Sequence, residues 1–295
     1  MLGIPLLYVL AVLPQAVINI LARSSAWFLW QANGRLRKVT EGNLAISMPG
    51  LSEIERDDLA RRSLHELCFN IMQIGRTVLW RPERLRARVT RVVGMDLLEA
   101  AVAHGKGTVI ILPHLGNWEL VNMVLTKDYS VTAMYKNPKS AVFDNFVLKG
   151  RERTGMTMVP TGMSGVRALL KTLKAGEMVI VLPDQVPPKS LGEFAPFFGE
   201  MTLTMNLVTN LVQRTGATAV CCYCKRLPDG KYELRIQPAE DDLYSPESAI
   251  ALAGLNRSVE RCVMDCPEQY QWQYKRYKYL PDFQKRDYGD KARDA

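Results

Sequence analysis

The sequence predicts an α/β fold with a mostly parallel central sheet, flanking helices and an antiparallel edge hairpin. Two apolar, β-branched runs at 109–112 and 179–182 have the length and composition of buried strands. Helical segments separate the candidate strands, as parallel neighbours require. A Pro-Asp-Gly turn at 228–230 then predicts a hairpin between 219–225 and 232–236.

The N-terminus is expected to attach the chain to a membrane. Residues 1–22 carry no charged side chain, and apolar character resumes at 26–30. Such a stretch is long enough to cross a bilayer, although Pro5 and Pro14 also fit a kinked or interfacial helix. A buried amphipathic helix is the alternative.

The first basic cluster lies after this apolar stretch and comprises Arg23, Arg35, Arg37 and Lys38. By the positive-inside rule, this order places the main domain in the cytoplasm. We therefore expect an anchor at 1–30 and one cytoplasmic domain at 31–295, which is helical over 31–91 and α/β over 92–295.

The elements follow from local patterns. Ser52-Glu53-Ile54-Glu55 forms a capping box that predicts a helix to about residue 79, whose apolar residues, Ile71 and Ile74 among them, are assigned to the core. Further helices are expected at 96–103, 118–126, 143–154, 164–174, 206–214 and 246–264. The remaining strands are expected at 92–93, 108–112, 131–135, 157–159 and 178–182.

The net charge indicates the class of binding partner, and the cysteines indicate the state of the thiols. A net charge of +8 and a pI near 9.2 favour anionic partners, such as phospholipid, phosphorylated glycolipid or an acidic carrier protein. Nucleic acid is disfavoured because the sequence has no zinc-finger spacing, RNP-like motif or basic tail. The six cysteines lack a CxxC pair, so we expect reduced thiols in the core.

The chemistry is expected at the end of the strand 108–112. His114 follows this strand directly, and Glu119 stands five residues later at the start of a helix. A histidine removes a proton from a hydroxyl when a carboxylate holds its tautomer and stabilises the imidazolium, and Glu119 is the local candidate for that carboxylate. The alternative is a strand-end histidine packed on Trp118.

A second strand ends in the same way. Both runs finish in Leu-Pro plus a polar residue, His114 in one and Asp184 in the other. If the strands are parallel neighbours, both residues open onto one crevice. The sequence has no HExxH, GxSxG, P-loop or GxGxxG pattern, which disfavours zincin, serine hydrolase and nucleotide-binding readings.

His114-Leu-Gly-Asn-Trp-Glu119 resembles the HxxxxD/E signature of glycerolipid-type acyltransferases, and closely resembles the HFGNWE form of the lipid A late acyltransferases. Further ordered blocks match along the chain, namely Lys136-Asn137-Pro138, the Arg151/Arg153 segment, Leu182 to Gln185, Pro196 to Gly199, and Pro267 to Trp272 with Lys275-Arg276. One departure is Lys136, where the family usually has arginine.

The resemblance implies transfer of a fatty acyl chain from acyl carrier protein to a hydroxyl of a lipid A precursor at the inner membrane, with phospholipid as a further partner. It implies catalytic roles for His114 and Glu119. We expect Arg151, then Arg153, to stabilise the oxyanion. We expect Asp184 to anchor that arginine or the turn carrying His114, its alternative being a structural strand-end cap. The expected substrate-binding residues are Asn117, Lys136, Arg153, Arg167 and Lys171.

Two groups of residues, and the function itself, have alternative interpretations. Phe194, Phe197 and Phe198 either line an acyl groove or belong to the aromatic core. Arg167, Lys171 and Lys174 either contact phosphates or the carrier protein, or form a solvated helix face. No metal or organic cofactor is expected. The alternative functions are acylation of another glycolipid or a lysophospholipid, and a catalytically silent lipid-binding protein.

Overall fold

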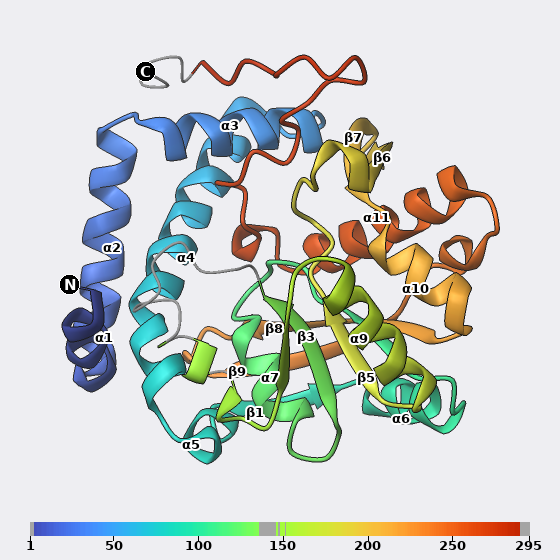
Figure 1. Cartoon of the computed structure of the whole chain (residues 1–295). Helices are drawn as coiled ribbons and strands as arrows, with labels where there is room; N and C mark the ends of the chain where they lie inside the picture. The colour runs from blue at the N-terminus through green and yellow to red at the C-terminus, as the bar shows by residue number, and fades with distance from the viewer. Residues whose placement is uncertain (1–2, 136–145, 147, 151, 290–295) are drawn as a thin grey trace.

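The computed structural model describes residues 3–135, 146, 148–150 and 152–289. Within this part of the chain, a seven-stranded sheet has the order β1-β9-β8-β2-β5-β3-β4. Helices cover both of its faces (Figure 1). The sheet strands are β1 (Val89–Val93), β2 (Thr108–Ile111), β3 (Val131–Tyr135), β4 (Thr157–Pro160), β5 (Met178–Val181), β8 (Thr218–Arg226) and β9 (Tyr232–Pro238).

The centre of the sheet is parallel, as the sequence predicted. β2 pairs with β5 on one side and with β8 on the other, and Ile111 stands opposite both Val181 and Cys221. All residues of β2 and β5 are buried. Because both faces are covered by helices, these strands are continuously apolar instead of alternating.

The predicted hairpin forms, but it does not lie at the edge. β8 and β9 pair antiparallel over 220–226 and 232–238. The far side of β9 pairs in parallel with β1, which is therefore the edge strand. The pattern at 92–93 marked this strand only in part, because β1 begins at Val89 and most of its residues are exposed.

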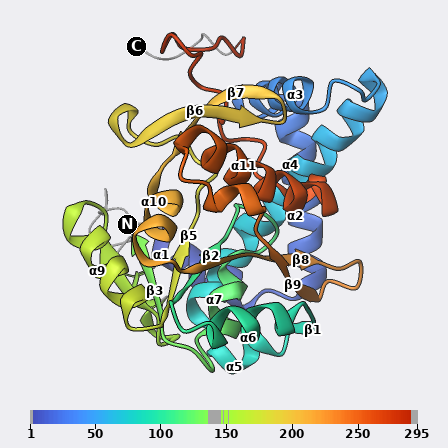
Figure 2. The same cartoon turned by 90° about the vertical axis from the view of Figure 1, so that its right-hand side faces the viewer.

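Alternate residues of the central strands pack on opposite layers of helices. Val109 and Ile111 face the layer of α9 (Met163–Lys174), α10 (Leu207–Thr215) and α11 (Ser248–Asp265). Ile110 and Leu112 face α5 (Pro82–Arg86), α6 (Met95–Ala103) and α7 (Glu119–Leu125). Figure 2 shows α11 on one side of the sheet and α6 and α7 on the other.

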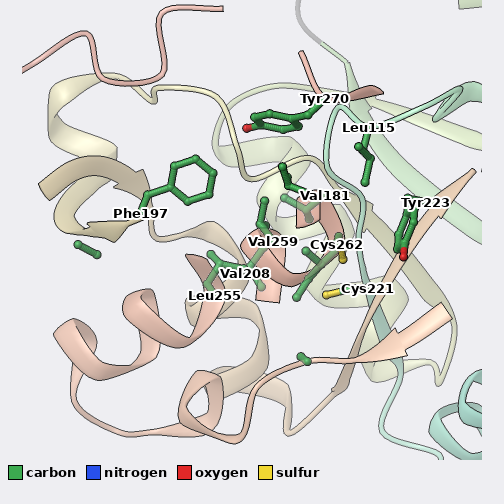
Figure 3. Packing of buried hydrophobic residues seen from close by; sticks show 14 of the residues in the cluster. Leu115, Val181, Phe197, Val208, Cys221, Tyr223, Leu255, Val259, Cys262 and Tyr270 are labelled. Carbon is green, nitrogen blue, oxygen red and sulfur yellow. The ribbon is translucent and has the colours of Figure 1, made fainter. Parts of the chain in front are cut away.

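The first layer contains the larger core. Figure 3 shows Val181, Val259 and Cys262 packed together, with Phe197 and Tyr270 nearby. All six cysteines are buried free thiols, as predicted. Phe197 lies on β6 (Gly192–Phe197), which forms a separate antiparallel hairpin with β7 (Glu200–Met205) that the sequence reading did not anticipate.

The N-terminal segment forms two helices in place of one anchoring helix. α1 (Gly3–Val12) and α2 (Gln15–Gln31) are separated at Pro14. Both lie against α4 (Glu53–Leu79), which begins at the predicted capping box, and α3 (Arg35–Ser47) follows α2 (Figure 1). Buried Leu10, Ile18 and Phe69 join the three helices. None of the helices in the described ranges is long and apolar enough to cross a membrane.

Of the helix expected at 143–154, residues 146, 148–150 and 152 are helical and 153–154 form a turn, while the other positions lie outside the described residues. Elsewhere, predicted helices and strands differ from the observed bounds by a few residues at most. Three short 3₁₀ segments complete the described chain, at Lys189–Leu191, Asp241–Tyr244 and Pro267–Gln269.

The turn after β2 requires glycine at position 116. Gly116 has φ +60, and a Cβ there would stand 2.1 Å from the carbonyl oxygen of Cys224. The backbone of Cys224 cannot move easily because it belongs to β8 at the centre of the sheet.

We predict that Gly116→Ala lowers the free energy of unfolding by about 3 kcal/mol or more, since strain and a backbone clash combine. Gly105→Ala is the matched control, because Gly105 has φ +76 with nothing within 4 Å of the added Cβ. Its cost should be about 1 kcal/mol, from the left-handed conformation alone. Denaturant titration of both variants measures the difference, and equal losses would contradict the close approach.

Candidate active site

A cavity of ≈ 410 Å³ opens where β2 leaves the sheet. Its walls come from α4, from the turn that carries His114 and Glu119, and from the segment 269–273. The α4 wall is mainly apolar and includes Leu67, Ile71 and Ile74. The cavity therefore combines an apolar interior with titratable groups at one end, which is the usual make-up of a ligand site.

The sheet fixes the backbone of His114. The parallel register of β2 and β5 brings the two Leu-Pro-polar ends together, and the His114 amide donates to Asp184 Oδ2 over 2.8 Å. The His114 carbonyl accepts from the Gln271 amide over 3.1 Å. Strand β5 and the C-terminal segment thus hold the turn from both sides.

Both ring nitrogens of His114 have described partners. Nδ1 lies 2.8 Å from Asp184 Oδ1. Because an ionised carboxylate only accepts hydrogen bonds, this contact assigns the proton of neutral His114 to Nδ1. Nε2 then presents a lone pair, which faces the Gln185 amide nitrogen at 3.2 Å. This is the tautomer that a general base needs.

Further contacts hold the His114 ring and the side-chain amide of Gln185 in place. Trp118 meets the imidazole edge-on, with the ring centroids 5.1 Å apart. Gln185 also donates to Gln271 Oε1 over 3.3 Å, so its amide is oriented before a substrate arrives. The imidazole is 15% exposed, which leaves it reachable from the cavity that it lines.

Asp184 is buried and remains charged. Burial alone would raise the pKa of Asp184, but the charge of His114, the hydrogen bonds from His114 and the charge of Arg276 hold it below the ordinary 3.8. Burial and the nearby Asp184 charge raise the pKa of the Tyr270 phenol, which stays neutral. The carboxylate is therefore available to stabilise an imidazolium on His114.

Arg276 supplies a second, longer-range positive charge behind Asp184. Its buried guanidinium donates to the Leu203 carbonyl at 2.6 Å and to Thr204 Oγ1 at 3.0 Å, both neutral acceptors. Burial lowers the pKa of Arg276, and Tyr270 and Asp184 raise it. The two buried charges thus compensate one another across the C-terminal segment.

Glu119 lies at the start of α7 and lines the same cavity as His114. The sequence assigned the ring-orienting contact to Glu119, but the structure places Asp184 on Nδ1. Asn117, a predicted substrate-binding residue, also lines the cavity, and its backbone N–H donates to the Cys224 carbonyl over 2.9 Å.

Other predicted site residues lie elsewhere. Arg153 donates to the Val78 carbonyl at 2.7 Å and to the Trp80 carbonyl at 2.8 Å, so it caps the end of α4 and does not line the cavity. Arg167 and Lys171 are exposed on α9, which contributes nothing to the cavity wall. Arg151 and Lys136 lie outside the described residues.

The apolar wall of the cavity comes from α4 and not from the phenylalanines that the sequence offered as a possible acyl groove. Phe197 is fully buried in the core, and none of Phe194, Phe197 and Phe198 lines the cavity. Ile71 and Ile74, assigned to the core from sequence, are 47% and 39% exposed and face the cavity. Leu67, Ile71, Ile74 and Val78 recur at helical spacing on one face of α4, but the buried Leu64, seven residues before Ile71, shares that face. The spacing alone therefore does not separate the cavity wall from the core.

Within the described ranges, no group of three or more His, Cys, Asp or Glu residues is arranged to hold a metal ion. The site instead offers a fixed imidazole base, a buried carboxylate behind it, a second carboxylate and an apolar cavity. Such an arrangement suits removal of a proton from a hydroxyl beside a long apolar group.

A site of this kind is typical of acid–base enzymes, and comparison with known proteins identifies the family. Residues 1–279 match the profile of the bacterial lipid A biosynthesis acyltransferases, and the chain belongs to that family. It is 28% identical over 283 residues to the lipid A biosynthesis lauroyltransferase of Escherichia coli K12, which covers 95% of this chain and 92% of the relative.

Two more relatives from the same organism are similar. The palmitoleoyltransferase is 28% identical over 249 residues, covering 84% of this chain and 80% of the relative. The myristoyltransferase is 24% identical over 234 residues, covering 78% and 71%.

The buried carboxylate predicts a pH dependence of stability. Because the native pKa of Asp184 is lowered, its charge stabilises the fold above the ordinary 3.8, and this contribution is lost as the pH falls through the native pKa. Below about pH 5, the free energy of unfolding should fall more steeply for the wild type than for Asp184→Asn.

Denaturant titrations across this pH window test the prediction. Asp128→Asn is the control, because the Asp128 side chain is 61% exposed. That variant should follow the wild-type curve. A curve for Asp184→Asn parallel to the wild type would show that the native pKa of Asp184 is not lowered.

Proposed function

We propose that this protein transfers a fatty acyl chain from acyl carrier protein to a hydroxyl of a lipid A precursor, with His114 as the general base. The observation that carries the proposal is the His114 ring itself: Asp184 holds Nδ1, which leaves Nε2 unprotonated on a ring that lines an apolar cavity. Family membership supplies the reaction class.

The proposed step is direct acyl transfer. Nε2 of His114 takes the proton of the acceptor hydroxyl as the hydroxyl oxygen attacks the thioester carbonyl carbon. The new ester bond forms, the carbon–sulfur bond breaks, and the leaving thiolate of the carrier takes the proton from His114. Asp184 stabilises the transient imidazolium, so its contribution is largest when the charge is present.

Glu119 is the second carboxylate of this mechanism. It lines the same cavity as His114, and its negative charge is proposed to stabilise the imidazolium that forms during transfer. The oxyanion requires a fixed donor, and Arg151 is proposed for that role on its place in the family's pattern. Arg153 is a weaker candidate because its guanidinium is occupied by α4 carbonyls.

The apolar α4 face is proposed to hold the acyl chain. Leu67, Ile71 and Ile74 give a lining on which each buried methylene contributes about 0.8 kcal/mol. Such a site also excludes water from the thioester, which limits hydrolysis.

The protein is proposed to act at the cytoplasmic face of the inner membrane. α1 and α2 expose large apolar side chains, with Val12 79%, Ile20 63% and Phe28 64% exposed. An apolar surface of this kind on a lipid-modifying enzyme suits a helix pair lying in the bilayer interface. The exposed basic residues of α9, Arg167 and Lys171, are proposed to meet the acidic carrier protein.

The test is transfer of labelled acyl groups from acyl carrier protein to a lipid IVA-type acceptor by the purified full chain. His114→Ala should lower kcat by about 10²–10⁴-fold, because the proton then has no base. Glu119→Ala should also lower kcat. His104→Ala is the control, since His104 is exposed and contacts Thr218 away from the cavity.

Wild-type turnover in His114→Ala would exclude the mechanism. Transfer only to another glycolipid or to a lysophospholipid would change the substrate. No transfer to any of these acceptors would favour a lipid-binding protein.

A further inference from the structure

A second cavity, of ≈ 670 Å³, lies where the bend between α1 and α2 meets the end of α4. Its walls come from the end of α1, from Pro14 and Gln15, from the last turn of α4, and from arginines on and after α5. It shares no lining residue with the catalytic cavity. The proposed reaction does not use it.

The charge of this cavity is one-sided. Arg76, Arg84 and Arg88 line it, and none of its described lining residues is acidic. Glu83, the acidic residue nearest to them in sequence, pairs with Arg86 over 2.8 Å. Three guanidinium groups around a shared space repel one another unless an anion lies among them.

Arg76 is the buried cation in this cavity that most lacks a counterion. Its side chain is buried, at 4% exposed, and its described partners are neutral: the Leu13 carbonyl, Gln15 and Gln73. Its Nε has no hydrogen-bond partner among the described atoms. Burial and the charge of Arg88 lower the pKa of Arg76. A buried cation without a counterion is costly, and an anion in the cavity offsets that cost.

The arginines are held in place before any ligand binds. Gln15 Oε1 accepts from both Arg76 and Arg88, the latter over 3.3 Å. Arg84 stacks on Trp80, with its guanidinium carbon 3.5 Å from the ring centroid. Trp80 is itself fixed by a 3.0 Å hydrogen bond to the Ala11 carbonyl. Rigid guanidinium forks suit the oxygens of a phosphate.

The end of α4 does not oppose an anion here. The C-terminal carbonyls of a helix carry partial negative charge, which would repel a phosphate. Arg153 covers the carbonyls of Val78 and Trp80. The net field in the cavity therefore stays positive.

The rim of the cavity is apolar. Tyr8 and Val12, which belong to α1 and line the cavity, are 54% and 79% exposed. A small hydrophilic anion makes no favourable contact with an apolar rim. An amphiphile with a phosphate headgroup matches both the arginines of the cavity and the apolar rim. We propose that the cavity binds the phosphate of an anionic lipid headgroup, with the lipid chains against the exposed face of α1.

This proposal is tested by binding without acyl transfer, so it does not depend on the proposed reaction. The full chain is mixed with vesicles of phosphatidylcholine alone or with added phosphatidylglycerol, and bound protein is separated by flotation. Arg84→Gln is the informative variant because Arg84 is exposed and its removal leaves the fold intact. Arg81→Gln is the control: Arg81 precedes α5, is exposed and does not line the cavity.

We expect Arg84→Gln to weaken binding to phosphatidylglycerol vesicles about tenfold or more. Arg81→Gln removes the same charge near the surface and should cost about fivefold or less. Binding to phosphatidylcholine alone should be the same for all three proteins. Equal losses in the two variants would overturn the proposal, because diffuse surface charge would then explain the binding.

Inorganic phosphate distinguishes a free anion from a headgroup. If millimolar phosphate raises the melting temperature of the wild type but not of Arg84→Gln, and both bind the vesicles equally, the cavity takes free phosphate and the lipid proposal is wrong. If vesicle binding differs as expected and phosphate does not displace the protein, the headgroup proposal stands.

Discussion

A single buried carboxylate joins the parts of this molecule that matter for function. Asp184 follows β5 and accepts from both the backbone and the ring of His114, which follows β2. Its negative charge survives burial because the charge and hydrogen bonds of His114 and the charge of Arg276 stabilise it. Removing that charge would loosen the turn and release the ring, and it would leave Arg276 as an uncompensated buried cation. The parallel register of β2 and β5 brings these two strand ends within hydrogen-bonding distance of each other.

Helix α4 links the proposed base, His114, to the proposed lipid contacts. Its Leu64 and Phe69 pack in two different cores, and its Ile71 and Ile74 line the cavity that contains His114. Its last turn contributes Arg76 to the second cavity. Thus an acyl chain beside His114 and a phosphate beside Arg76 would lie on one rigid helix. The bend at Pro14 places α1 and α2 against that helix, which is why an apolar N-terminus appears as two packed helices.

Much of the sheet and the position of His114 were predictable, because buried parallel strands and their polar ends carry strong local patterns. The partner of His114 Nδ1 was not predictable. Glu119 is five residues from His114 in sequence, whereas Asp184 is 70 residues away and is brought close only by strand pairing. Burial of Arg276 likewise depends on the C-terminal segment returning to β7. The role of Arg153 as a helix cap and the exposure of Ile71 are set by tertiary packing, which no local pattern encodes. The edge position of β1 depends on strand order in the same way.

The function proposed for His114 depends on Asp184 holding the ring in the tautomer with an unprotonated Nε2. Nitrogen-15 NMR of histidine-labelled protein at a pH where His114 is neutral measures this directly, with His114→Gln used to assign the signal. The structure predicts a protonated Nδ1 and an unprotonated Nε2 in the wild type, and a mixture of tautomers in Asp184→Asn. A wild-type spectrum with the proton on Nε2 would contradict the account.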